Sequence, residues 1–267
     1  MIRKFIEVYC APKKEIPRSL YISISSCVGI SLILVWCLLS YGGLVRPDFL
    51  PAPHLVFWSA YELMLDGSLA GHTLSSLAVI YTGFLLATLP AIPIGIFMGS
   101  FRIVAAAIEP VVNFVRYLPV TSMIPLLILW IGIGFEEKIT VIFIGTFFQQ
   151  IILVADVSGQ VSRDLVNVSY TLGATRRQVV SQVLVPAALP GVMDVLRVTM
   201  GWAWTYLVVA ELVASNSGLG YMILQAMRGL HPEVIFVGIL VIGLLGLITD
   251  QLFNFLRRWL LPWSEKI

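Results

Sequence analysis

Few side chains in this 267-residue sequence have the types and spacing that covalent chemistry requires. It contains no GxxxxGKS/T phosphate loop, no HExxH zinc pair, no CxxC pair and no GxSxG nucleophile motif. The three histidines, His54, His72 and His231, all fall in predicted loops, and their spacing does not favour a metal site. The sequence therefore predicts a protein that is not an enzyme and that binds neither a metal nor a cofactor.

The remaining candidates are polar side chains inside apolar segments, where ionisable groups are costly and usually functional. Asp194 and Arg197 are three residues apart and share a helical face, so we expect an ion pair between them. The alternative is that Arg197 helps an anion to leave the membrane. Glu211 is expected to be a gate or a packing residue. Other residues that could line a low-affinity pathway, or else only pack between helices, are Thr146, Gln149, Gln150, Trp202, Trp204 and Thr205.

The segments that position these residues are apolar. Hydrophobic residues make up 58% of the chain and charged residues 12%, whereas a soluble domain has roughly 25% charged residues. Crossing the hydrocarbon core of a membrane takes a helix of about 20 apolar residues. Six segments reach or approach that length: about 20–42, 73–99, 117–135, 139–157, 191–214 and 234–255. We predict an all-α integral membrane protein with six transmembrane helices.

Two domains follow from this division. Residues 1–18 are basic and form a cytoplasmic segment or a helix on the membrane surface. Residues 19–267 form the six-helix domain, with a polar loop at 160–190. In the second span, Gly95 and Gly99 predict close helix packing, although small residues are common in membrane helices.

The charge distribution predicts the orientation. If both termini are cytoplasmic, 13 of the 17 lysine and arginine residues lie on that side, including Arg102 and Arg116 at either end of an interfacial stretch. Only three lie in the outer loops. The excess of positive charge on the cytoplasmic side of membrane proteins supports this topology, and it places loop 160–190 in the cytoplasm.

Loop 160–190 has the pattern of two helices joined at a glycine. Gly173 is expected to end a first helix at about 162–172, because glycine tolerates the positive φ of a helix terminus. A second helix would follow at about 174–184, and Pro186 and Pro190 would close the loop before the fifth span.

This loop resembles the cytoplasmic loop of membrane subunits of binding-protein-dependent ABC importers. That loop reads E-A-A-x-x-x-G, then nine residues, then I-x-L-P. Gly173 matches the glycine, and Val183-Leu184-Val185-Pro186 matches the closing motif. Asn167-Val168-Ser169 stands in place of Glu-Ala-Ala. Further segments, from Tyr117-Leu118-Pro119 to Ser217-Gly218-Leu219-Gly220, resemble the branch that imports nitrate, bicarbonate, taurine and other sulfonates.

The resemblance implies that the first loop helix is a coupling helix seated in a groove of an ATPase subunit. Arg176 and Arg177 would pair with acidic groups of that partner or with lipid phosphates; the alternative is a solvated basic pair. The residues implied in coupling are Arg163, Asp164, Val166, Asn167, Val168, Ser169, Tyr170, Leu172, Gly173, Ala174, Arg176, Arg177 and Pro186. Among these, Val166, Val168, Tyr170 and Leu172 would supply apolar contacts, with Arg163 and Asp164 at the rim.

The resemblance also implies the partners and the substrate class. The chain would act in the inner membrane as a homodimer of permeases, with two ABC ATPase domains that bind ATP and Mg²⁺. A periplasmic or lipid-anchored binding protein would deliver a small anion: nitrate, bicarbonate, or taurine or another sulfonate. Lipid surrounds the spans, and no nucleic acid is expected. The alternatives are a permease for a neutral vitamin precursor, or a secondary transporter or channel subunit without an ATPase.

Overall fold

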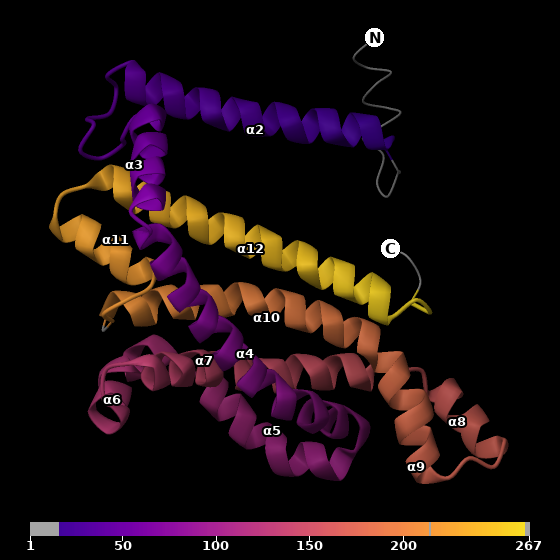
Figure 1. Cartoon of the computed structure of the whole chain (residues 1–267). Coiled ribbons are helices and arrows are strands. Elements are labelled where there is room, and N and C mark those ends of the chain that lie inside the picture. Colours follow the sequence, from indigo (N-terminus) through magenta and orange to yellow (C-terminus); the bar gives the residue numbers. More distant parts are fainter. Residues whose placement is uncertain (1–15, 214, 265–267) are drawn as a thin grey trace.

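The computed structural model describes residues 16–213 and 215–264, and within these ranges it consists of helices and the loops that join them (Figure 1). The helices before the polar loop are α2 (Arg18–Tyr41), α3 (Pro53–Leu65), α4 (Ser68–Ser100), α5 (Arg102–Arg116), α6 (Val120–Ile131) and α7 (Phe135–Gly159). The rest are α8 (Arg163–Thr171), α9 (Arg176–Gln178), the π-helix η1 (Val179–Leu184), α10 (Val185–Val213), α11 (Leu219–Arg228) and α12 (Pro232–Leu260). Residues 1–15 of the predicted N-terminal segment lie outside the described residues.

The described helices supply the predicted spans. Four of them, α2, α4, α7 and α12, are each long and apolar enough to cross a bilayer, and so is the continuous helix from α9 to α10. The pair α5 and α6 qualifies as a sixth, broken span. The all-α, membrane-spanning architecture is therefore confirmed.

The core of the bundle lies where α4, α7 and α10 pack together. Buried apolar side chains from all three helices form one cluster, which includes Ile80, Ile142 and Leu207. The glycines of α4 allow α7 to approach closely, because a Cβ atom at Gly95 would lie 2.7 Å from the Val154 side chain. A Cβ atom at Gly99 would lie still closer to α7, at 2.2 Å from the carbonyl oxygen of Ala155. The predicted close packing at these two glycines is confirmed.

The third span differs from the prediction, which placed it at 117–135. Helix α6 has only 12 residues, and the chain bends by 91° between α5 and α6. Pro119 explains the bend, because a proline has no amide hydrogen to continue a helix and disfavours the helical conformation of the residue before it. Arg116 is also displaced from the predicted cytoplasmic boundary: its carbonyl oxygen accepts a hydrogen bond of 3.5 Å from Gln149, which lies near the middle of α7.

The fifth span also begins earlier than predicted. The helix runs without interruption from Arg176 to Val213, so Pro186 and Pro190 lie inside it rather than at its start. The π-helical turn η1 ends at Leu184, two residues before Pro186, and the amide of Val185 donates to Val180 rather than to Ser181. Such a turn accommodates the hydrogen bond that a proline cannot make, so the helix continues past both prolines.

Helix α2 is set apart from this bundle (Figure 1), and none of its residues is buried. Its contacts are at its C-terminal end, where the ring of Trp36 stacks on Phe236 at 5.9 Å and its indole nitrogen donates to the Pro51 carbonyl at 3.0 Å. The exposed side chains of α2 are mostly apolar, with several serines among them, which suits a helix that lies in lipid or against another chain.

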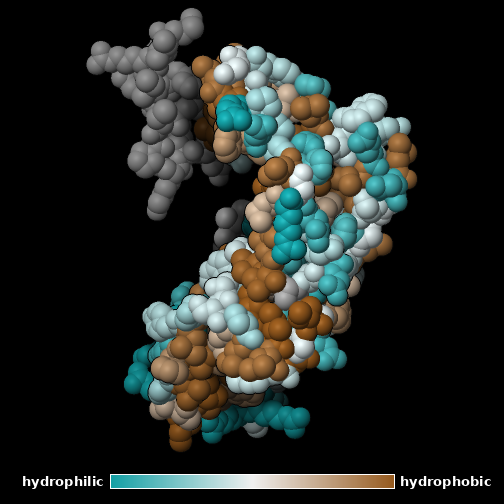
Figure 2. All heavy atoms as spheres, turned by 90° about the vertical axis from the view of Figure 1, so that its left-hand side faces the viewer, coloured by the Kyte–Doolittle hydropathy of each residue, from teal (hydrophilic) through white to brown (hydrophobic). Residues whose placement is uncertain are grey.

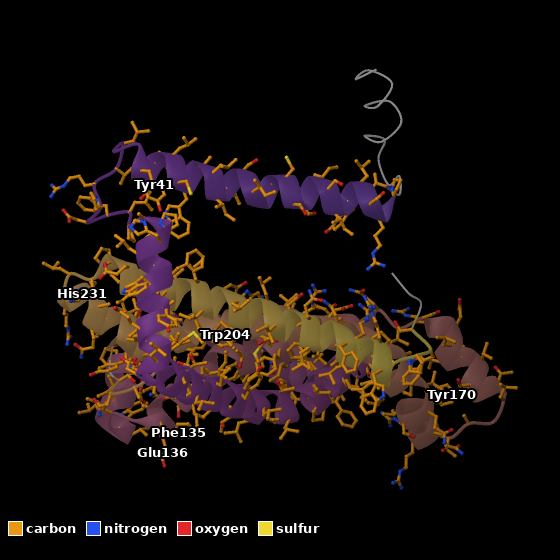
Figure 3. The ribbon with its side chains drawn as sticks, turned by 45° about the horizontal axis from the view of Figure 1, so that its top comes forward. Tyr41, Phe135, Glu136, Tyr170, Trp204 and His231 are labelled. Atoms are coloured by element: carbon orange, nitrogen blue, oxygen red, sulfur yellow. The ribbon has the colours of Figure 1, made fainter. Side chains whose placement is uncertain are left out.

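The bundle has two distinct ends. Tyr41, Phe135, Glu136 and His231 lie at one end and Tyr170 at the other, with Trp204 between them (Figure 3). The beginning of α2, the end of α12 and helix α8 share the Tyr170 end (Figure 1). At the opposite end, which carries α3 and α11, polar and apolar side chains are intermixed on the surface (Figure 2).

Candidate coupling surface and pathway

Helix α8 projects from the Tyr170 end of the bundle, and none of its residues is buried. The hydroxyl of Ser162 caps its first turn by accepting a hydrogen bond of 3.2 Å from the Asp164 amide. Leu165, Val168 and Leu172 follow at helical spacing and are 51%, 57% and 81% exposed. They form an apolar stripe, which we call the α8 stripe, on the exposed side of a helix whose other side faces η1.

The structure places the four residues that were predicted to supply apolar contacts on two sides of α8. Of the four predicted apolar contacts, Val168 and Leu172 belong to the stripe, whereas Val166 and Tyr170 line a cavity on the bundle side of α8. Leu165 was missed. The signal that finds it is the helical period of 3.6 residues, because Leu165, Val168 and Leu172 are separated by three and four positions.

The turn after α8 is fixed from both sides. Gly173 has φ of +85°, its amide donates to Tyr170 at 2.9 Å, and the Ala174 amide donates to Ser169 at 3.0 Å. These are the two hydrogen bonds of a Schellman motif. On the other side, Thr175 and Gln178 form a capping box that starts α9. The prediction that Gly173 ends the first helix is confirmed, and the capped turn fixes the angle between α8 and α9.

The predicted basic residues lie around this turn. The Arg176 guanidinium stacks over the Phe101 ring at 4.8 Å, which ties α9 to the end of α4. Arg177 and Asp164 are exposed. Arg163 lines the cavity of about 410 Å³ beneath α8, together with Arg102 at the start of α5.

Three of the predicted pathway residues, Gln150, Thr146 and Trp204, are buried between helices. The Gln150 amide of α7 bonds to Thr88 of α4 at 3.1 Å and to Thr199 of α10 at 3.2 Å. Thr146 is also buried, and its hydroxyl donates to the Ile142 carbonyl of its own helix at 2.7 Å. Buried Trp204 has an indole nitrogen with no hydrogen-bond partner in the described part of the chain.

The other predicted pathway residues are more accessible. Trp202 and Thr205 lie on the exposed side of α10, and Gln149 is half-buried beside the α5 terminus. The structure thus separates the predicted set into an interhelical group, Thr146, Gln150 and Trp204, and an accessible group, Gln149, Trp202 and Thr205. Lining of a pathway by any of them stays a prediction.

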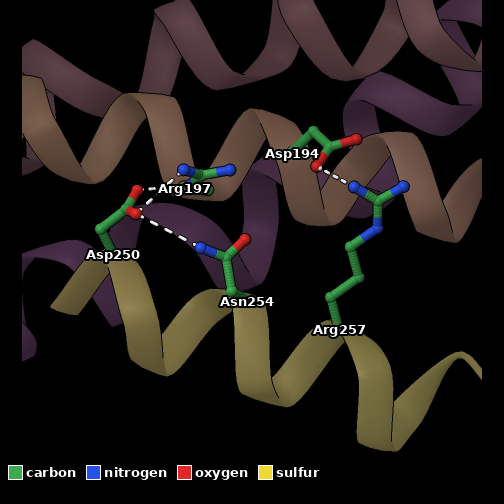
Figure 4. A network of polar contacts seen from close by, with 5 residues as sticks. All are labelled: Asp194, Arg197, Asp250, Asn254 and Arg257. Carbon is green, nitrogen blue, oxygen red and sulfur yellow. Dashed lines mark hydrogen bonds and ion pairs between the residues drawn. The ribbon is translucent and has the colours of Figure 1, made fainter. Parts of the chain in front are cut away.

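The predicted ion pair between Asp194 and Arg197 does not form. Each residue instead pairs with α12 (Figure 4): Arg197 binds Asp250 through two nitrogens, and Arg257 donates to Asp194 at 2.7 Å. Asn254 adds a hydrogen bond of 3.3 Å to Asp250. The pairs cross to α12 because that helix packs beside the same face of α10. Because Asp250 neutralises its charge, Arg197 is a weak candidate for binding an anion.

Glu211 closes the opposite end of the bundle. Its carboxylate is fully buried and accepts hydrogen bonds of 2.8 and 3.0 Å from Ser76 and of 2.8 Å from the Gly220 amide. Ser76 in turn accepts from the Leu219 amide at 2.8 Å. These contacts tie the first turn of α11 to α4 and α10, where a carboxylate is favoured by the helix dipole. Glu211 is a packing residue in this structure.

The three histidines make local contacts. His54 bonds to Tyr41 at 2.8 Å, His72 accepts from the Gly218 amide at 3.2 Å, and His231 contacts Glu233 at 3.2 Å. Each histidine thus has its own local partner. In residues 16–213 and 215–264, His, Cys, Asp and Glu residues form no group of three or more that could hold a metal ion.

These features define a class: a multi-pass membrane subunit with an exposed helix–turn–helix at one end. The chain belongs to the family described as the binding-protein-dependent transport system inner membrane component, whose model matches residues 91–262. The resemblance noted in the sequence is thereby confirmed, and the protein is a permease subunit of a type I ABC importer in the inner membrane.

Three relatives carry more specific names. The putative aliphatic sulfonates transport permease protein SsuC of Bacillus subtilis is 34% identical over 88% of this chain and 85% of its own length. The taurine transport system permease protein TauC of Escherichia coli is 31% identical over 94% and 93%. The nitrate import permease protein NrtB of Synechocystis is 28% identical over 88% of each chain. All are named as permeases, which confirms a transport subunit rather than an enzyme.

A solved structure shares the fold. A chain of the MetNI methionine ABC transporter, in an inward-facing conformation, has a TM-score of 0.59 and 23% sequence identity, covering 72% of this chain and 97% of that chain. At this identity the match establishes the fold, and it agrees with the helical membrane architecture described above.

Proposed function

We propose that this chain is the permease subunit of an ATP-driven importer for a small anion, and that α8 is the helix through which separate ATPase subunits drive it. The α8 stripe carries the proposal, because an exposed apolar patch on a helix that projects from the end of the bundle is typical of a surface that another protein covers. The capped turn at Gly173 supports it, since a rigid turn transmits a displacement of α8 directly into α9 and α10.

The orientation is part of this proposal. The beginning of α2, the end of α12 and α8 share one end of the bundle, and we assign that end to the cytoplasm because the charge pattern of the sequence predicts an excess of lysine and arginine on that side. Two copies of the chain would form the pathway, and two ATPase domains with ATP and Mg²⁺ would bind the two α8 helices. ATP-driven closure of the ATPase pair would draw the α8 helices together and open the bundle to the binding protein.

The proposed substrate is an anion such as nitrate, bicarbonate, or taurine or another sulfonate. Relatives named for taurine, sulfonates and nitrate support the class. The chain alone does not distinguish among them, because the external binding protein would make the selective contacts.

Replacement of one residue in the α8 stripe tests the proposal. Leu172→Glu should abolish co-purification of the ATPase and ATP-driven anion uptake, because it places a charge in the apolar contact. Leu230→Glu is the matched control: Leu230 is 85% exposed, close to the 81% of Leu172, but lies at the opposite end. Normal ATPase binding by Leu172→Glu, with uptake unchanged, would overturn the proposal.

A further inference from the structure

Arg116 is a cation near the middle of the bundle with no acid to neutralise it. It makes no ion pair within residues 16–213 and 215–264, and its Nε atom is buried without a hydrogen-bond partner in the same part of the chain. Its other contacts are with Tyr117: Nη2 donates to the phenol oxygen at 3.1 Å, and the guanidinium stacks over the ring at 4.7 Å. Arg197, in contrast, is bound by Asp250.

The depth of Arg116 follows from its neighbour on α7. Gln149 donates to the Arg116 carbonyl, ten residues before the end of α7 at Gly159 and fourteen after its start at Phe135. At 1.5 Å per residue these separations are about 15 Å and 21 Å. Since the hydrocarbon core of a bilayer is about 30 Å thick, Arg116 lies close to the middle of the membrane.

A cation at that depth needs water or a counter-charge. A charged side chain near the bilayer centre generally faces the bundle interior or a water-filled cavity, because exposure to hydrocarbon is costly. Arg116 lies one helical turn after buried Val112, on the face of α5 that packs against α4 and α7. It also lies at the end of α5, directly before the bend, where its guanidinium stacks on the exposed ring of Tyr117.

The groups around Arg116 are hydrogen-bond donors. The Gln149 amide nitrogen donates one hydrogen to the Arg116 carbonyl and has a second, and the Tyr117 hydroxyl accepts from the guanidinium and keeps its own hydrogen to donate. Helix α6 begins at Val120 with no side chain capping its first turn, so its free amide groups and positive dipole end lie four residues from Arg116. A guanidinium presents its donors in a planar fork that matches two oxygens of an oxyanion.

We propose that Arg116, Gln149 and the first turn of α6 form an oxyanion-binding site midway along the translocation pathway. The site deepens the proposed function and rests on it. It takes anions whose charge is spread over several oxygens, the feature that nitrate, bicarbonate and sulfonate groups share. It holds them weakly and briefly, because only one full charge faces the ligand.

Uptake by the reconstituted complex of permease, ATPase and binding protein in proteoliposomes tests this site, with nitrate, bicarbonate and taurine as probes. Arg116→Gln should lower uptake of the transported anion by about tenfold or more, the effect of losing one charge-assisted hydrogen bond. Arg116→Lys should restore part of it, because the charge remains without the fork. Arg258→Gln, an exposed arginine near the end of α12, is the control and should transport normally.

A second variant keeps the guanidinium in place. Gln149→Glu puts a carboxylate beside Arg116, so it should lower uptake per assembled complex as Arg116→Gln does, while ATPase binding stays at the wild-type level. Wild-type uptake by both Arg116→Gln and Gln149→Glu would overturn the site. The site would also be overturned if the loss of uptake followed a loss of stability, so that uptake per assembled complex were the same as in the wild type. If the wild-type complex hydrolyses ATP but transports no anion, the proposed function itself fails.

Discussion

Replacement of Gly173 by valine tests the α8 turn most sharply. Gly173 has φ of +85°, and a Cβ atom there would meet nothing within 4 Å, so the cost of a side chain is purely conformational. A left-handed backbone costs about 1–2 kcal/mol for an ordinary L-residue and more for a β-branched one. If the turn opens to relieve this strain, the two Schellman hydrogen bonds are lost, at about 0.5–1.5 kcal/mol each.

In both cases the free energy of unfolding falls by about 1–3 kcal/mol, which is less than the roughly 5–15 kcal/mol that stabilises a domain. The protein should therefore fold and insert. Docking of α8, however, would require the turn in its native, strained conformation. The cost of about 1–3 kcal/mol is then subtracted from the binding free energy, so the affinity for the ATPase should fall by about 5- to 150-fold. Gly173→Asn should keep more of the affinity, because asparagine tolerates positive φ better than valine.

ATPase binding to purified permease in nanodiscs measures the effect. Gly67→Val is the matched control: Gly67 has φ of +76°, and a Cβ atom there also meets nothing within 4 Å, but it lies between α3 and α4 at the other end. The control should lose similar stability and bind the ATPase normally. Wild-type ATPase affinity in Gly173→Val would refute the reasoning about the turn.

Three further predictions concern the packing of the bundle. Gly95→Val should destabilise it by about 1–3 kcal/mol in thermal unfolding through overpacking against α7, whereas Gly246→Val, with open space around it, should have little effect; equal melting temperatures would contradict the close packing. Ser76→Ala should cost about 1–3 kcal/mol, because a buried carboxylate loses its hydroxyl donor; an unchanged unfolding midpoint would contradict that role. Asp250→Asn should cost about 1–3 kcal/mol, between the values for exposed and buried ion pairs; in a double-mutant cycle with Arg197→Met, additive effects would show that the pair contributes nothing.

Local signals in the sequence predicted the elements well. Apolar length found the spans, because a helix must bury or shield its side chains in lipid whatever its neighbours are. Gly173 predicted the turn, since a glycine separated by nine residues from the Val183-Leu184-Val185-Pro186 segment has a local conformational role that needs no tertiary contact. Gly95 and Gly99 predicted close packing for a similar reason, because small size has few other uses at that spacing.

Features that depend on direction or on distant partners were not predicted. Hydropathy measures how apolar a segment is and not where it points, so the 91° bend before α6 was missed and Arg116 was placed at the membrane boundary. The partners of Arg197 and Asp194 are 53 and 63 residues away on α12, and no spacing rule reveals such pairs. The prolines were misjudged because a π-helical turn, which lets a helix continue, has no clear sequence signal.

Cross-linking from the α8 stripe tests the central claim most directly. In membrane vesicles that hold the intact importer, with the native cysteines replaced, Leu172→Cys should cross-link to the ATPase subunit, and Leu230→Cys at the opposite end should not. The account predicts a specific permease–ATPase product from the α8 position. No product from that position in an assembled complex, or labelling of it from outside intact cells, would contradict the account.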